Sequence, residues 1–253
     1  MKNKQFLLSL LFVSIFGIQH INAQIDVKLI NAQIDKKMSF EVRACGSFPQ
    51  GDFSNYVYEQ TIFGNSGSAD VGFDFGIKFC QPIKSIKNLS CTISIDYINN
   101  GLSQQFKDKF YADGKSAINN SSVNINMSYP TYTNIPIFAG LNYIIPIVAK
   151  YGLYVEGGIG TNFASVSDLI ATAKYNGLSA SSTISIKSSQ ALAGQIGAGF
   201  LFDKKISLGV NYNLLGSYSF SGTSKASNDL ETVIPSEGKI SITMLNIYLG
   251  YRL

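Results

Sequence analysis

The chain has no tryptophan, a single histidine and few charged residues, which make up 14% of its 253 residues. The one histidine, His20, lies in a segment typical of a secretory signal, so a processed chain would contain none. Without histidine there is no Ser-His-Asp triad, no Cys-His pair and no histidine-ligated metal. A hydrolase would need another nucleophile and base, such as serine with lysine, and no spacing singles one out. We therefore expect a protein that is not an enzyme and carries no cofactor and no metal.

Long apolar runs are missing as well. No stretch reaches 18 consecutive apolar residues, so a transmembrane helix is not expected. The mean hydropathy of +0.13 is nevertheless high for a soluble protein. Such a chain must either bury its apolar residues in a core or turn them toward lipid.

The N-terminus has the features of a signal peptide. Lys2 and Lys4 precede an apolar run, Phe6 to Ile18, that is too short to span ~30 Å of hydrocarbon, and Ala23 offers a small residue for cleavage. We expect residues 1–23 to form the signal peptide, 24–36 a periplasmic N-terminal segment, and 37–253 the folded domain. Because residues 21–26 repeat as 30–35, cleavage after Ala32 stays open.

Charge and cysteine content give mostly negative information. Loss of Lys2 and Lys4 lowers the count of lysine and arginine from 20 to 18, against 16 acids, so nothing points to nucleic-acid binding. Cys45, Cys80 and Cys91 are odd in number, so at least one thiol is unpaired within the chain. Cys80 and Cys91 fall on opposite strand faces, and we expect no disulfide between them.

Alternation of large apolar residues with small or polar ones runs through the rest of the chain. In the last such segment, Leu245, Ile247 and Leu249 alternate with Asn246 and other polar or small residues. Period two is typical of strands with one apolar face. The same pattern predicts eight strands, at about 38–46, 70–79, 89–97, 134–143, 151–160, 192–202, 206–214 and 244–253.

The connections between these strands alternate in length. Three are short, at 81–88, 146–150 and 203–205, and four are long, at 47–68, 99–129, 165–189 and 216–238. Short periplasmic turns and long external loops are typical of outer-membrane barrels. The fold expected is therefore all-β, a single antiparallel up-and-down transmembrane barrel of eight strands. Residues 121–128 and 183–187 are expected to extend hairpins beyond the membrane.

The polar strand faces are rich in glycine, which suits the narrow lumen of an eight-stranded barrel. The bulky faces would then meet lipid, and tyrosines near strand ends would lie at the membrane interfaces, namely Tyr97, Tyr132, Tyr143, Tyr151 and Tyr251. The alternative is a soluble exported barrel of lipocalin type, with the bulky faces inside around a small apolar ligand.

Charged residues on the polar faces are expected to form an ion-pair network that closes the lumen, because a buried charge needs a partner. Strand adjacency suggests that Arg43 pairs with Asp74 and Arg252 with Glu41. The predicted network comprises Glu41, Arg43, Asp70, Asp74, Lys78, Asp96, Glu156 and Arg252.

The first long loop is unusually aromatic. Its candidate contact residues are Phe53, Tyr56, Tyr58 and Phe63. These side chains could contact a protein partner or ligand, because loops commonly carry function. The alternative is that they pack over the barrel mouth or lie at the membrane interface, where aromatic residues are common.

Several motifs resemble those of the PorT-like outer-membrane β-barrel domain family. They are Gly46 to Phe53 (GSFPQGDF), Asn134 to Tyr143, and Gly194 to Gly199 before a tight turn at Asp203. The resemblance implies a small monomeric barrel in the cell outer membrane, of the outer-membrane protein A or X type. It also implies a structural or interaction role through the external loops, or an accessory role in protein secretion. The ending Tyr251-Arg252-Leu253 resembles the signal by which the barrel-insertion machinery recognises its clients.

Overall fold

The computed structural model of the chain describes residues 38–56, 66–118, 122–148, 150–176, 178–186, 188–218, 222–226, 231–234 and 239–253. The expected signal peptide and periplasmic segment lie outside the described residues. Tyr58 and Phe63 lie outside them as well.

Eight antiparallel strands close into a barrel, in the order β1-β13-β10-β9-β6-β5-β3-β2. Each strand pairs with the barrel strands that precede and follow it along the chain, and β1 pairs with β13 to close the ring. The predicted up-and-down barrel of eight strands is confirmed. The strands are β1 Ser39–Gln50, β2 Ala69–Pro82, β3 Leu89–Leu102, β5 Thr131–Val148, β6 Tyr151–Val166, β9 Ser189–Phe202, β10 Ile206–Tyr218 and β13 Ile240–Arg252.

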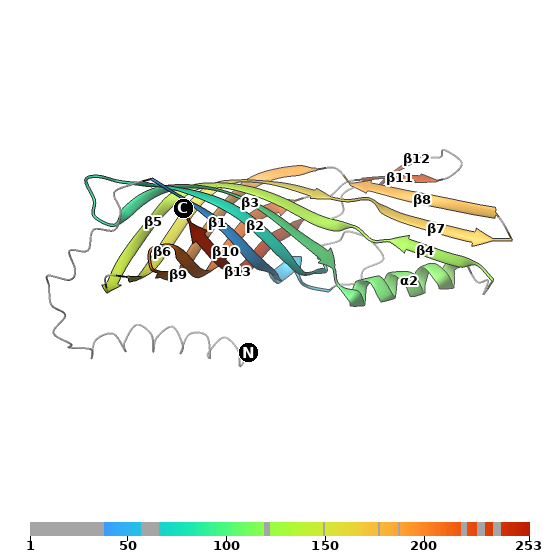
Figure 1. Cartoon of the computed structure of the whole chain (residues 1–253). Coiled ribbons are helices and arrows are strands. Elements are labelled where there is room, and N and C mark those ends of the chain that lie inside the picture. The colour runs from blue at the N-terminus through green and yellow to red at the C-terminus, as the bar shows by residue number, and fades with distance from the viewer. Residues whose placement is uncertain are drawn as a thin grey trace.

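The long connections are more ordered than expected. They contain a second sheet of five strands, a short 3-10 helix and an α-helix, and this assembly continues from one end of the barrel, opposite the end where the chain terminates (Figure 1). We call the five-stranded sheet and its helix α2 the extension. Its elements are β4 Asn124–Ser128, β7 Leu169–Tyr175, β8 Leu178–Ile186, β11 Gly222–Ala226, β12 Glu231–Ile234 and α2 Gln104–Ile118.

Strand within 121–128 and 183–187 was expected, and β4 and β8 occupy most of those ranges. Helix α2 was not expected, because the segment Lys107-Asp108-Lys109 gave only a solvated charged pattern. Phe106 and Phe110 lie on one side of α2, four residues apart, and pack on the barrel's apolar core, while its charges face outward. Among the described residues, no helix is both long and apolar enough to cross a membrane.

Side chains alternate between the two faces of the barrel wall. Bulky apolar side chains point outward and are about half exposed, for example Phe75 at 58%, Ile95 at 50% and Leu249 at 59%. Their neighbours Asp74, Asp96 and Tyr248 point inward and are buried. We call the outward bulky side chains of the eight barrel strands the apolar belt. Because β-strand residues alternate with period two, one sequence pattern builds both this belt and the polar interior.

The apolar core lies inside the barrel at the end that carries the extension. Phe53, from the short 3-10 helix η3 Gly51–Phe53, is completely buried there against Tyr132, with ring centroids 5.0 Å apart. Ile98, Leu215 and Met244 belong to the same cluster. This end of the lumen is therefore filled by hydrocarbon.

Glycine is required where interior side chains approach the wall. A methyl group on Gly209 would overlap the Tyr154 hydroxyl and lie 2.8 Å from Cζ of Tyr248. We expect Gly209→Ala to lower the free energy of unfolding by about 1–3 kcal/mol, because overpacking displaces both rings. Gly101→Ala is the matched control: its methyl would meet no described atom within 4 Å and should change stability by less than about 0.5 kcal/mol. Urea unfolding in lipid vesicles, followed by circular dichroism, measures both. Equal effects of the two variants would contradict the packing argument.

Candidate functional site

Arg43 lies at the centre of the barrel interior. Its side chain is 1% exposed and contacts two carboxylates, with Nη2 3.0 Å from Oδ1 of Asp96 and Nη1 3.4 Å from Oε1 of Glu156. Its guanidinium also lies over the ring of Tyr248, 5.1 Å from the centroid. Arg43 thus joins β1 to β3 and to β6 across the lumen.

A second set of ion pairs continues the network toward the short-turn end. Nζ of Lys78 lies 2.9 Å from Oε2 of Glu156 and 3.3 Å from Oε1 of Glu41. Glu41 also accepts a hydrogen bond from Arg252 at 3.1 Å and one from Ser207 at 3.0 Å. Since Glu41 is paired in register with both Lys78 and Arg252, adjacent strands bring these groups together. The expected Arg252–Glu41 pair is present.

The expected pairing of Arg43 with Asp74 is wrong. Residue 76, directly opposite Arg43 in β2, is a glycine, and Asp96 is the next residue in register beyond it. The guanidinium therefore passes over Gly76 to reach Asp96. Asp74 instead accepts a hydrogen bond from the Asn246 amide at 2.6 Å.

Asp70 was expected in the interior network and does not belong to it. The register of β2 with β3 shifts between Ala69 and Gly72, which breaks the alternation at the end of the strand. Asp70 is exposed, and its carboxylate accepts a hydrogen bond from the backbone N–H of Val71 at 2.8 Å. The structure places the other seven predicted residues inside the barrel, with Arg252 half-buried at its end.

Several interior residues were missed, although strand parity could have found them. The hydroxyls of Tyr154 and Tyr248 lie 2.6 Å apart, and Tyr248 donates to Glu156 at 3.4 Å. The amide of Asn142 donates to the same carboxylate at 3.3 Å. These groups supply hydrogen bonds to charges that water cannot reach, as a buried ion-pair network requires.

Of the four aromatic residues expected in the first long loop, Phe53 and Tyr56 are described, whereas Tyr58 and Phe63 lie outside the described residues. Phe53 is part of the apolar core, which agrees with the alternative that this loop packs over the barrel mouth and excludes Phe53 from a partner contact. Tyr56 is partly buried against the same core. Tyr132 also departs from expectation: it is buried and donates its hydroxyl to the carbonyl of Gly67 at 2.6 Å, instead of lying at a membrane interface.

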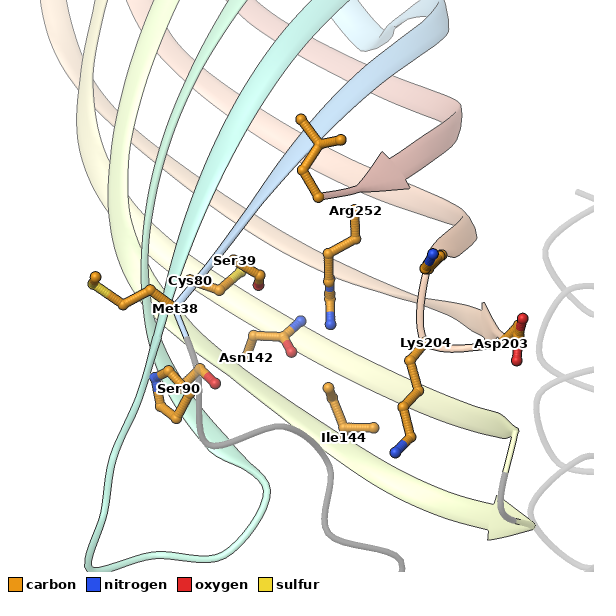
Figure 2. Close-up of a pocket in the computed structure, with 12 residues that line it drawn as sticks. Met38, Ser39, Cys80, Ser90, Asn142, Ile144, Asp203, Lys204 and Arg252 are labelled. Atoms are coloured by element: carbon orange, nitrogen blue, oxygen red, sulfur yellow. The ribbon is translucent and has the colours of Figure 1, made fainter.

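A cavity of about 530 Å³ opens at the short-turn end of the barrel. Figure 2 shows Met38 and Ser90 on one side of this space, Asp203 and Lys204 on the other, and Arg252 and Asn142 between them. Its polar lining comprises Ser39, Ser90, Asn142, Asp203, Lys204, Lys205 and Arg252. The cavity therefore combines three basic side chains with one carboxylate and with hydroxyl and amide groups.

The extension has one polar and one more apolar face. Side chains directly paired in register share a face, so Ile125 of β4 lies with Ala173 of β7, and Asn126 lies with Thr172. Ile125 is buried, whereas Asn126 is exposed. Helix α2 lies beside β4 (Figure 1), and its Lys107 carbonyl accepts a hydrogen bond from Tyr129 at 2.9 Å.

No family model and no curated protein matches the chain. Similar solved structures include Neisserial surface protein A, which is 14% identical, with a TM-score of 0.41 over 85% of this chain and 96% of that chain. A major outer membrane protein from Thermus thermophilus is 13% identical, with a TM-score of 0.45 over 85% and 99% of the two chains. OprG from Pseudomonas aeruginosa is 12% identical, with a TM-score of 0.43 over 87% and 98%. The closed barrel described above rests on the strand pairing of this chain itself.

Proposed function

We propose that this chain is a non-enzymatic barrel of a bacterial outer membrane, exported by its N-terminal signal peptide, with a closed lumen and an external interaction surface. The observation that carries the proposal is the belt of outward bulky side chains on all eight barrel strands. A soluble monomer rarely exposes more than a few hundred Å² of contiguous apolar surface. Lipid is the solvent that such a belt fits.

The interior supports the closed lumen. The charged groups of the middle section contact one another directly, and the apolar core fills the end nearest the extension. Eight strands enclose a lumen just wide enough for side chains, whereas a water-filled channel needs about 16. The barrel wall is therefore a scaffold, not a pore.

The lipocalin-like alternative fits the structure poorly. It requires bulky residues around an internal apolar site and the small polar face in water. Glu156 and Asp74 are instead 7% and 2% exposed, while Phe75 on the opposite face of the same strand as Asp74 is 58% exposed.

The extension supports an interaction role. It places the helix α2 and a five-stranded sheet beyond the barrel end, on the long-loop side that faces outward in such barrels. Most exposed side chains of its outer face are polar, among them Asn124, Asn126, Lys174, Ser179 and Ser181. Membership of the PorT-like family, proposed from the motif at Gly46 to Phe53, would suit this role.

Membrane fractionation tests the location. Expressed in a Gram-negative host, the protein should remain in the membrane pellet after a carbonate wash and migrate differently on a gel before and after boiling. A fully soluble mature protein would overturn the proposal.

Planar-bilayer recording tests the lumen separately. The purified barrel should give no steady conductance above the bare bilayer, while a 16-stranded porin in the same bilayer conducts, because paired side chains occupy the narrow interior. Steady ohmic conductance of the folded barrel would contradict the closed lumen and leave the membrane location intact.

A further inference from the structure

The three short connections of the barrel are strongly basic. Residues 83–88, 149–150 and 203–205 contain five lysines and one acid, Asp203. We call these lysines the basic collar: Lys84, Lys87, Lys150, Lys204 and Lys205. Four of them are exposed, and Lys204 is half-buried at the cavity described above (Figure 2). The collar therefore forms one cationic rim around the short-turn end.

An aromatic level lies directly above this rim. Tyr143, Tyr151 and Tyr251 point outward on the ends of β5, β6 and β13 and are 42–51% exposed. Tyr151 packs edge-on against Phe202, with ring centroids 6.1 Å apart. Tyrosines at the edge of an apolar belt, followed by lysines, match the order of hydrocarbon, glycerol and phosphate in a bilayer leaflet.

Helix α2, in the described part of the opposite end, has no such excess of positive charge. On α2, Lys107, Lys109 and Lys115 alternate with Asp108 and Asp113, and the Lys109–Asp113 pair is closed at 2.9 Å. Cations and anions are interspersed on this helix, so it offers no concentrated positive field. The charge asymmetry belongs to the barrel end that the short turns form.

We infer that the basic collar binds the phosphate groups of an anionic phospholipid leaflet. The inference rests on the proposed membrane location. It adds the lipid class, anionic phospholipid, and places these lipids in the leaflet on the short-turn side of the barrel. Charge complementarity and continuity with the apolar belt favour lipid over a soluble anion, because lipids already touching the belt present phosphates at the height of the collar. The collar thereby holds the short-turn end at one leaflet surface.

Brominated lipids test this inference directly. The chain has no tryptophan, so its emission comes from tyrosine, and brominated lipids near a tyrosine quench that emission. Tyr143, Tyr151 and Tyr251 lie next to the collar and are exposed to these lipids. The folded protein is placed in mixed vesicles with brominated phosphatidylglycerol or brominated phosphatidylcholine. We expect relative binding of phosphatidylglycerol over phosphatidylcholine of at least about threefold at low salt, falling toward one in 0.5 M NaCl.

Two variants of equal charge change separate the collar from net charge. The collar variant is K84Q/K87Q/K150Q/K204Q/K205Q, and the control is K107Q/K115Q/K174Q/K225Q/K239Q, whose lysines lie at the opposite end. The collar variant should lose the preference and the control should keep it. Equal loss in both variants, or no preference in the native chain, would overturn the inference.

Two further outcomes are distinguishable. If the native chain integrates into neither type of vesicle, the proposed membrane location is wrong. If it integrates but shows no headgroup preference, only the inference that the basic collar binds lipid phosphates is overturned. If soluble glycerol phosphate at the same phosphate concentration abolishes the preference, the collar is a general anion site and the lipid assignment is wrong.

Discussion

Replacing Arg43 with methionine is expected to lower the free energy of unfolding by about 3–5 kcal/mol, because it leaves Asp96 and Glu156 without their shared cation. The arginine side chain is 1% exposed, so water cannot take its place. Lys78 still contacts Glu156, but Asp96 makes no second ion pair within the described part of the chain. The loss comes from the stranded carboxylates more than from the missing attraction.

Urea titration of the barrel in lipid vesicles, followed by circular dichroism, measures this change. The control is Lys109→Met, which breaks an exposed pair on α2 and should change stability by less than about 1 kcal/mol. The double variant R43M/D96N should recover part of the loss, because it also removes one stranded charge. A loss below about 1 kcal/mol for R43M would show that the interior charges are solvated, and the closed lumen would then fail as well.

The eight barrel strands were predictable because lipid and lumen impose opposite demands on alternate residues. On β2, Phe73, Phe75 and Ile77 point outward while Asp74 and Lys78 point inward, and this contrast is visible in the sequence. The pattern does not mark the ends of the strands. Most barrel strands extend farther toward the long loops than expected, because beyond the belt the outer positions no longer need to be apolar.

The site was predicted less completely, for a geometric reason. The alternation of strand faces correctly assigns Arg43 to the interior. Its ion-pair partner depends on the size of the residue opposite it in β2, and because that residue is Gly76, the guanidinium passes over it to Asp96. Asp70 was misplaced because a register shift is a property of two paired strands and leaves no mark in one of them. The extension was predicted only in part: parts of β4 and β8 were expected, but α2 and the pairing of five strands into one sheet were not. Serine, threonine and alanine, in which β7 and β8 are rich, are equally common in loops.

Ile95→Arg is expected to lower the free energy of unfolding in a bilayer by about 2–4 kcal/mol, the usual effect of arginine near the midplane of a lipid-facing barrel wall. Ile95 is half exposed and is paired in register with Ile77 and Ile137, both of which also point outward. A guanidinium there meets hydrocarbon on every side. In an aqueous barrel the same change would be nearly neutral, because an exposed arginine is well solvated.

Ile170→Arg provides the matched control. Ile170 is also an outward isoleucine, 39% exposed, but it lies on β7 of the extension, where its register partners are Ser128 and Thr183. Water surrounds that position if the belt alone meets lipid, so its substitution should change stability by less than about 0.5 kcal/mol. Equal small losses would place both surfaces in water, and equal large losses would place the extension inside the membrane. A large loss at Ile95 alone locates the membrane boundary between the barrel wall and β7.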